Sequence, residues 1–263
     1  MKYVIVTGAY GGMGYATVKA LKSKGYFVFA VDKNVGEPEE YVLPIKADLT
    51  SDAEVSDAIA KVREYTDTVY AVVHFAGIYM LDSLVEIEPE KFTRIFDINV
   101  FAAYRLNRAV LPLLKEGSRI VITTSELAPL DPLPFTGLYA ITKSALDKYA
   151  YSLRMELQLL GIKVIQLRPG AVDTGMLGVS TAALDRFCDS TSYYSCNAKR
   201  FKKIVESVEA RSVKSEKIAS KTAKILAARS PKYIYKINSN PLLVLLSVLP
   251  KRVQTFIIKM ILK

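Results

Sequence analysis

Residues 7–14 read T-G-A-Y-G-G-M-G, at the end of a short apolar run, Y-V-I-V-T at residues 3–7. Gly8, Gly12 and Gly14 lack a Cβ, so the chain can turn tightly here and its backbone can approach a ligand closely. A helix that begins at this turn points its free N–H groups and the positive end of its dipole at that ligand. The segment therefore predicts a strand, a phosphate-binding turn and a helix in succession.

Similar apolar runs recur along the chain, with helix-length segments between them. The expected strands are residues 3–7, 26–31, 42–46, 69–73, 119–123 and 163–168, and the expected helices are 12–24, 51–65, 89–114 and 137–160. Continuous apolar runs suit strands that are buried on both faces, whereas Pro44 places its strand at an edge or a bulge. The alternation predicts an α/β fold, a Rossmann-type doubly wound parallel sheet in a single-domain αβα sandwich.

The charge of the chain is unevenly distributed. Residues 199–263 hold 16 Lys and Arg against 3 Asp and Glu, whereas the rest of the chain holds 20 and 23. This asymmetry indicates an anionic partner, such as a membrane surface, or alternatively a solvated helix face. The start of the chain shows no signal peptide, which favours a cytoplasmic location. The single histidine, His74, lies far from both cysteines, so no metal site is expected.

Two nearly identical pentapeptides each place a tyrosine and a lysine four residues apart. They are Y-A-T-V-K at residues 15–19 and Y-A-I-T-K at 139–143. On a helix both side chains share one face, and an ammonium beside a phenol can lower the pKa of the phenol. The spacing alone is a weak signal in a chain with 16 tyrosines. Only the second copy follows a hydroxyl at the end of an expected strand, Ser125, and this context makes it the candidate for chemistry.

Three further segments of the sequence carry recognisable motifs. They are H-F-A-G at residues 74–77, I-N-V at 98–100 and R-P-G-A-V-D-T-G-M at 168–176. With the glycine turn and the second pentapeptide, they make residues 1–180 similar to the short-chain dehydrogenase/reductase family in its single-domain form. The catalytic residues that this resemblance implies are Asn99, Ser125, Tyr139 and Lys143. The cofactor-binding residues that it implies are Thr7, Gly8, Tyr10, Gly12, Met13, Gly14, Asp32, Lys33, Asp48, Leu49, Ala76, Gly77, Tyr139, Lys143, Pro169, Gly170, Val172 and Thr174.

Asp32 follows the second expected strand and bears on the choice of cofactor. A carboxylate there can accept hydrogen bonds from both adenosine ribose hydroxyls and repels a 2′-phosphate, which favours NAD over NADP. Lys33 can partly offset that charge, so NADP is not excluded. Alternatively, Asp32 simply caps the end of the strand. His74 and Phe75 stand where the family has two asparagines, and the interval from Ser125 to Tyr139 is longer than usual.

The resemblance implies hydride transfer between the nicotinamide and an alcohol or ketone carbon. Tyr139 is expected to exchange the proton, Ser125 to hold the substrate oxygen and Lys143 to lower the phenol pKa while binding the ribose. Asn99 is expected to hold a water beside Lys143, and Val172 and Thr174 to hold the carboxamide. Two alternatives are a non-catalytic NAD-binding regulator or scaffold and a nucleotide-sugar epimerase or dehydratase.

Residues 175–211 are expected to form a substrate loop in a catalytic domain that covers residues 1–238. The loop contains the apolar and aromatic residues Met176, Leu177, Leu184, Phe187, Tyr193 and Tyr194. They favour a lipophilic substrate, steroid-like, long-chain or aromatic, or else they are the ordinary packing of a lid. The residues expected to contact substrate are Ser125, Tyr139, Met176 and Phe187.

The remaining residues, 239–263, form a basic amphipathic tail. Its first run, P-L-L-V-L-L-S-V-L-P at residues 241–250, is too short to span a membrane as a helix. Beyond it, Val253, Phe256, Ile257, Met260 and Ile261 share one side of an expected helix, and the cations lie outside that set. Three interpretations stay open: peripheral docking on an anionic membrane surface, a lid or dimer contact, and core packing. The resemblance itself implies a homodimer or homotetramer built on the long helices, and no motif indicates nucleic-acid binding.

Overall fold

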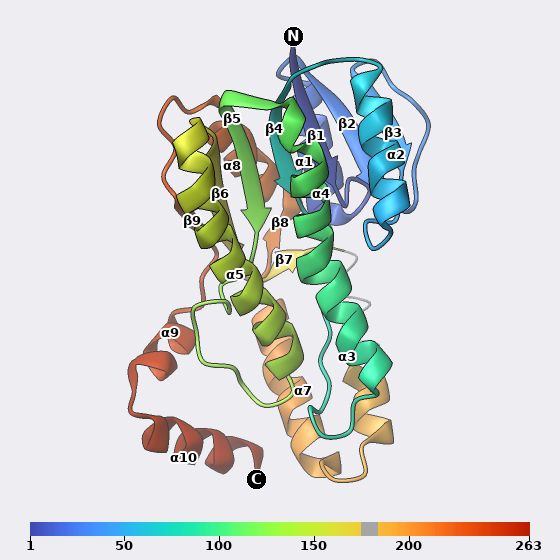
Figure 1. The fold of residues 1–263 in the computed structure, drawn as a ribbon. Helices are drawn as coiled ribbons and strands as arrows, with labels where there is room; N and C mark the ends of the chain where they lie inside the picture. Colours follow the sequence, from blue (N-terminus) through green and yellow to red (C-terminus); the bar gives the residue numbers. More distant parts are fainter. Residues whose placement is uncertain (175–183) are drawn as a thin grey trace.

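A parallel sheet forms the centre of the molecule (Figure 1). A computed structural model describes residues 1–174 and 184–263, and in these ranges seven strands pair in the order β3-β2-β1-β4-β5-β6-β9. They are β1 (Lys2–Thr7), β2 (Tyr26–Asp32), β3 (Val42–Lys46), β4 (Val69–His74), β5 (Leu114–Thr123), β6 (Lys163–Pro169) and β9 (Ile234–Ile237). The strand order reverses at β1, which pairs with β2 on one side and β4 on the other. Ligands of such sheets bind beyond the carboxyl ends of the strands near this point.

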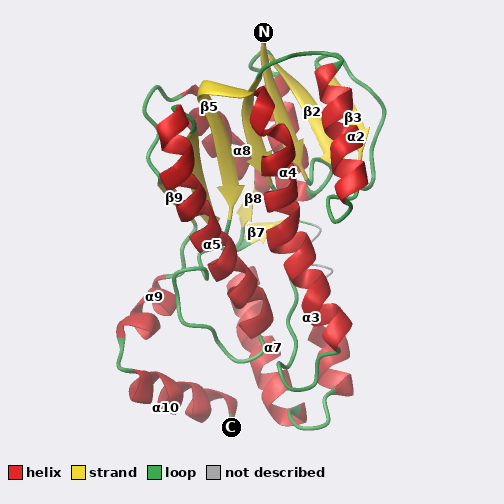
Figure 2. Cartoon of the chain, viewed as in Figure 1, coloured by secondary structure: helices red, strands yellow, loops and turns green. Residues whose placement is uncertain are grey.

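Helices cover both faces of this sheet (Figure 2). One face carries α1 (Gly12–Lys22) and α8 (Ser215–Ala227), and the other carries α2 (Asp52–Arg63), α4 (Ala102–Val110) and α5 (Gly137–Leu157). Side chains alternate between the faces, so Val4 and Val6 pack with the first group and Ile5 with the second. The three-layer doubly wound architecture predicted from the sequence is confirmed.

The sheet differs from the prediction at its two edges. β3, the strand with Pro44, is an edge strand as predicted. The opposite edge, β9, was not predicted, because I-Y-K-I is only four residues long and includes a lysine. A small parallel pair, β7 (Val172–Asp173) with β8 (Val213–Lys214), lies beside the main sheet.

The long helix expected over residues 89–114 is interrupted in its middle. It consists of α3 (Pro89–Phe96), a π-helical turn at Asp97–Phe101, α4, and a 3₁₀ turn at Leu111–Leu113. π turns are rare and occur frequently at functional sites. This one contains Asn99, whose side chain is 1% exposed. The interruption therefore coincides with a residue that the family resemblance assigns to the catalytic site.

The C-terminal part of the chain packs below the carboxyl ends of the strands (Figure 1). Residues 184–190 are helical and precede α7 (Ser195–Glu209), and α5 continues into a 3₁₀ turn at Gln158–Leu160. The tail forms α9 (Pro241–Val248) and α10 (Lys251–Leu262). Leu262 is buried with Phe201 of α7 in a separate apolar cluster, and the Asn197 amide donates to the Leu262 carbonyl at 2.6 Å. The tail is therefore packed against the rest of the chain.

The turn at residues 8–14 predicts an asymmetric response to two alanine substitutions. A Cβ at Gly14 would lie 1.9 Å from the carbonyl oxygen of Gly8, whereas the nearest atom of the described residues to a Cβ at Gly11 lies 3.4 Å away. We expect Gly14→Ala to lower the free energy of unfolding by about 2 kcal/mol or more. Gly11→Ala, the matched control, should lower it by less than about 1 kcal/mol. Urea denaturation measures both, and equal losses would contradict the close approach at Gly14.

Candidate active site

The glycine turn packs directly against loops that follow two other strands. Gly8 has a left-handed φ of 61°, and a Cβ there would lie 2.7 Å from the Ala76 nitrogen, just after β4. A Cβ at Gly12 would lie 2.8 Å from the Thr174 Cβ, after β6. The Ala76 N–H donates to the Thr7 hydroxyl at 3.2 Å, which closes the contact. Three loops at the carboxyl ends of the strands thus meet around a strip of backbone that has no side chains at Gly8 and Gly12.

This strip fits the pyrophosphate of a dinucleotide. The N-cap residue of α1 is Gly11, and no side chain among the described residues caps the helix there. A helix start without a side-chain cap leaves N–H groups and positive dipole for an anion. Met13, in the first turn of α1, lines the adjoining cavity. The predicted glycine turn therefore opens α1 beside the cavity, with the start of the helix available to an anion.

Asp32 lies at the end of β2 beside this turn. Its carboxylate accepts the Tyr10 N–H at 3.0 Å and the Asn34 N–H at 3.3 Å, so it does brace the local backbone. The Lys33 ammonium, which we considered as a partial offset to the Asp32 charge, lies 2.7 Å from the Asp48 carboxylate. Burial opposes ionisation of Asp48, but the hydrogen bonds from Lys33 and Thr50 outweigh it and lower the pKa. Leu49, by contrast, is buried in the core.

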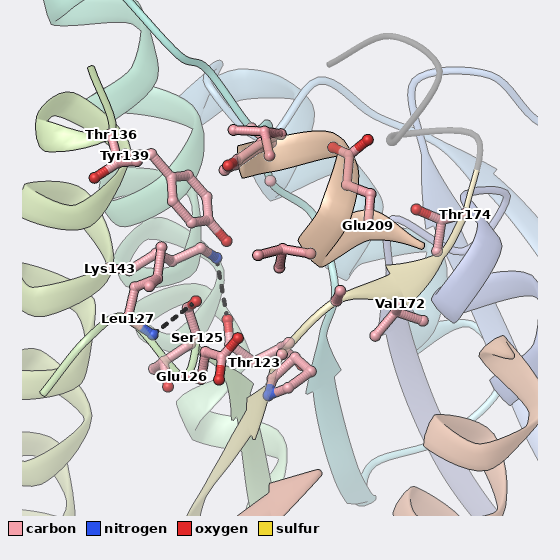
Figure 3. Close-up of a pocket in the computed structure, with 18 of the residues that line it drawn as sticks. Thr123, Ser125, Glu126, Leu127, Thr136, Tyr139, Lys143, Val172, Thr174 and Glu209 are labelled. Carbon is pink, nitrogen blue, oxygen red and sulfur yellow. Dashed lines mark hydrogen bonds between the residues drawn. The ribbon is translucent and has the colours of Figure 1, made fainter. Parts of the chain in front are cut away.

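Ser125, Tyr139 and Lys143 line one cavity that is open to solvent (Figure 3). Ser125 lies just beyond β5, and Tyr139 and Lys143 come from the first two turns of α5. The Lys143 ammonium donates to the Thr123 carbonyl at 3.2 Å, and the Leu127 N–H donates to the Ser125 hydroxyl at 3.1 Å. The structure therefore brings together the three side chains that the sequence analysis linked.

Burial sets the protonation states of this trio. Burial raises the pKa of Tyr139 to about 12, although a hydrogen bond with Ser125 acts in the opposite direction and the Glu126 charge adds to the rise. Burial also lowers the pKa of Lys143 to about 8. We expected the ammonium to lower the phenol pKa, but desolvation is the larger effect. The phenol is therefore neutral near pH 7 and available as a proton donor.

Asn99 joins α5 to the loop after β4. Its side-chain oxygen accepts the Ile78 N–H at 2.8 Å, and its amide donates to the Ile78 carbonyl at 2.9 Å and to the Thr142 hydroxyl at 3.1 Å. A Cβ at Gly77 would lie 3.1 Å from the Asn99 oxygen and 3.6 Å from the Lys143 nitrogen. The π turn thus places Asn99 next to Lys143, in a position to fix the loop.

The segment after β6 forms the opposite wall of the cavity. Figure 3 shows Val172 and Thr174 across the cavity from Tyr139 and Lys143, and Pro169 and Gly170 also line it. The segment is tied to α5 by the Arg168 guanidinium, which donates to both carboxylate oxygens of Asp147 at 2.9 and 2.8 Å. This bidentate pair holds the end of β6 against α5.

Several wall residues were missed by the sequence analysis. The Tyr79 ring packs edge-on against Tyr139 with centroids 4.6 Å apart, and burial raises the pKa of Tyr79. The face of α7 contributes Phe201, Ile204, Val205 and Val208. Their helical spacing was a readable signal within the expected substrate loop, but no sequence signal pointed to Tyr79 or to Leu243 of α9. The apolar wall of the cavity is therefore built from segments that lie farther apart in the sequence than we expected.

Met176 and Phe187, which we expected to contact substrate, are not among the described residues that line the cavity. Met176 lies outside the described residues. Phe187 does not line the described cavity, because it is buried behind the wall, with ring centroids 4.9 Å from Phe135. Leu184 is buried in the same cluster, and Tyr193 is 76% exposed. Packing beneath α7 thus accounts for most of the aromatic and apolar residues in residues 184–194.

His74 and the first pentapeptide do not line the described cavity. Burial lowers the pKa of His74 to about 4, and its Nε2 atom lies 2.8 Å from the Asn107 side-chain oxygen. The first pentapeptide lies on the surface of α1, where Tyr15 is 42% exposed and the Lys19 ammonium lies 4.2 Å from its ring centroid. Tyr15 and Lys19 do not line the cavity that holds Tyr139 and Lys143.

Comparison with known proteins identifies relatives of this chain. The family model described as short chain dehydrogenase matches residues 2–185. Estradiol 17-beta-dehydrogenase 2 of Mus musculus is 32% identical over 189 residues, which cover 67% of this chain and 50% of that protein. The chain therefore spans half the length of this relative. The 3-ketodihydrosphingosine reductase of Bacteroides thetaiotaomicron is 23% identical over 235 residues, 89% of this chain and 87% of that one.

A solved structure agrees with the fold. The 3-ketoacyl-(acyl-carrier-protein) reductase from Brucella melitensis, complexed with NADH, has a TM-score of 0.73 and 23% identity, covering 90% of this chain and 96% of that chain. The match of the family model over most of the chain, on the same segments that build the glycine turn and the Ser125–Tyr139–Lys143 trio, decides the assignment. The chain belongs to the short-chain dehydrogenase family of NAD(P)-dependent oxidoreductases.

Proposed function

We propose that this protein interconverts a lipophilic ketone and its alcohol with NAD(H) as cofactor. The observation that carries the proposal is the convergence of Ser125, Tyr139 and Lys143 on one wall of a largely apolar cavity. The glycine turn adjoins the same cavity through Met13, and Thr174 reaches it from the opposite wall. Proton donor, oxygen-binding hydroxyl and cofactor cradle are therefore within one site.

Each residue of the trio has a role that follows from its surroundings. When bound, the nicotinamide supplies or accepts the hydride. In the reduction, the Ser125 hydroxyl donates a hydrogen bond to the substrate oxygen, and Tyr139 gives the same oxygen its phenolic proton. The Lys143 ammonium then stabilises the phenolate. In the oxidation, the phenolate takes the proton from the alcohol, so high pH favours that direction.

The walls of the cavity support a lipophilic substrate. Leu133, Phe201, Ile204, Val205, Val208 and Leu243 line it. Burying apolar surface of a ligand against such side chains contributes about 25 cal/mol per Å². The two sequence relatives described above are named for estradiol and for 3-ketodihydrosphingosine, a steroid and a long-chain ketone. These observations favour a substrate of that kind over a sugar or a nucleotide sugar.

A non-catalytic NAD-binding scaffold is the second candidate. It would need the cofactor cradle but no proton donor. The buried trio argues against it, because a lysine at 6% exposure costs free energy that a purely binding role does not require. Turnover is therefore the better explanation for the site.

A second copy of this chain is the expected protein partner. Tyr104 of α4 is 47% exposed, and Tyr151 and Met155 of α5 are 51% and 48% exposed. These residues form apolar surface on the long helices that the family resemblance implicates in a homodimer or homotetramer. Large exposed aromatic side chains are enriched in such interfaces.

Removing the phenolic hydroxyl is the first test. We expect Tyr139→Phe to lower kcat/KM for ketone reduction by about 10²- to 10⁴-fold, because the substrate oxygen loses its proton donor. Binding of NADH, measured by fluorescence titration, should change by less than about threefold, since the fold is intact. Tyr15→Phe, which alters the surface pentapeptide, should retain most of the activity. Near wild-type turnover by Tyr139→Phe would exclude its proposed role.

Cofactor choice tests the position of Asp32. We expect the wild type to prefer NADH over NADPH in kcat/KM by about tenfold or more, equivalent to about 1.4 kcal/mol. Asp32→Asn removes the charge that repels a 2′-phosphate and should reduce this preference about tenfold. Asp67→Asn, an exposed carboxylate elsewhere, is the control. A wild-type preference for NADPH would overturn the assignment.

The buried lysine predicts a pH profile. Lys143 carries its charge below a pKa of about 8, and Tyr139 is protonated below about 12. Reduction uses the ammonium and the protonated phenol together. Therefore kcat/KM for NADH, which reports the enzyme without cofactor, should be constant below pH 8 and fall about tenfold per pH unit above it. Initial rates across this range measure it, and a profile that stays level to about pH 10 would contradict the titration of Lys143.

A further inference from the structure

Helix α10 presents three different strips of side chains. At about 100° per residue, Gln254, Ile258 and Leu262 share the strip that faces the protein, and Gln254 and Leu262 are buried. The next strip is apolar but exposed: Val253 is 41%, Phe256 63%, Met260 68% and Ile261 53% exposed. The third strip carries Arg252, Lys259 and Lys263. Core packing therefore uses one strip of α10 and leaves a second apolar strip facing solvent.

The exposed strip is held in a fixed orientation. The Asn240 N–H at the start of α9 donates to the Glu126 carboxylate at 2.6 Å, and the Lys251 ammonium pairs with Asp131. The Gln254 amide donates to the Leu249 carbonyl at 2.7 Å, which braces the corner between α9 and α10. Leu262 anchors the far end. These contacts make the strip a built surface rather than a loose tail.

Helix α9 extends the apolar surface. Leu242 is 63%, Leu245 58% and Val248 72% exposed, whereas Leu243 of the same helix lines the catalytic cavity. Both helices lie apart from the central sheet (Figure 1). None of the helices in the described ranges has the length and apolarity needed to cross a bilayer. The surface suits contact with a bilayer face rather than insertion across it.

Charge decides between the candidate occupants. Residues 239–263 contain four cations and no Asp or Glu. A twofold contact with a second copy through α10 would place the cationic strips of both copies at the same interface, and like charges at an interface cost affinity. Anionic lipid headgroups complement the same charges, and each basic side chain near such a surface strengthens binding. The cationic strip next to an apolar strip therefore fits an anionic bilayer better than another copy of this chain.

We propose that α9 and α10 together form a docking surface for an anionic phospholipid bilayer. The apolar strip lies among the headgroups and upper acyl chains, and the cationic strip contacts phosphate groups. Because α9 also supplies Leu243 to the cavity wall, docking places that wall beside the lipid. The proposal goes beyond the proposed reaction and does not depend on it.

Vesicle binding of the full chain tests this proposal. Deleting the tail is unsuitable, because deletion would also remove Leu262 from its cluster and Leu243 from the cavity. Point variants at exposed positions avoid this: Phe256→Ser with Met260→Ser for the apolar strip, and Arg252→Glu with Lys259→Glu for the cationic strip. The matched controls are Leu159→Ser with Leu160→Ser, at positions that are 83% and 57% exposed, and Lys24→Glu with Arg63→Glu. Co-sedimentation uses phosphatidylcholine vesicles with or without about 30% phosphatidylglycerol.

We expect the wild type to bind the anionic vesicles at least about tenfold more tightly than the neutral ones. Each tail variant should bind at least about tenfold more weakly than the wild type, and each control should stay within about twofold. Raising the salt from about 0.1 M to 0.5 M should weaken wild-type binding at least about tenfold, a test that needs no variant. Absence of binding to anionic vesicles, or binding that the tail variants leave unchanged, would overturn the proposal. Self-association that only the Phe256→Ser, Met260→Ser variant abolishes, without vesicle binding, would replace the lipid by a second copy.

Discussion

Close backbone contact around the glycine turn is the constraint on which the rest of the site depends. Cβ atoms at Gly8, Gly12 and Gly14 would lie 2.7, 2.8 and 1.9 Å from their nearest neighbours. Without them, the loops after β1, β4 and β6 can meet at one point. That meeting places the bare start of α1 beside the cavity in which Tyr139 and Lys143 lie. The sheet order supplies the position, and the glycines make the contact sterically allowed.

Burial also controls the charges of the site. The same burial raises the pKa of Tyr139 and lowers that of Lys143, so both groups are driven toward their neutral forms. The Thr123 carbonyl and the Ser125 hydroxyl partly compensate, by accepting from the ammonium and by hydrogen-bonding the phenol. A phenol that is neutral at pH 7 suits proton donation to a ketone. The environment, rather than the Tyr-x-x-x-Lys spacing, thus sets the protonation state of the tyrosine.

Much of this could be predicted from sequence, for identifiable physical reasons. Buried parallel strands are continuous apolar runs, so six of the seven main-sheet strands in the described residues could be read directly. Ser125 distinguished the two pentapeptides, because only the second copy follows such a hydroxyl. The structure places Tyr15 and Lys19 of the first copy on the outer surface of α1. The π turn at Asn99 was not predicted, because no residue type marks such a turn in a helical segment. Tyr79 and Leu243 depend on long-range packing that no local pattern encodes.

We propose that the buried trio supports hydride transfer between a bound nicotinamide and a lipophilic carbonyl compound. The most direct measurement is the change in absorbance of the reduced cofactor when the purified protein is mixed with a panel of ketosteroids, long-chain ketones, small aliphatic ketones and sugars. We expect steady consumption of NADH with members of the first two groups and much slower consumption with the others. Tight binding of NADH without turnover on any member of the panel would contradict the claim and favour a binding role instead.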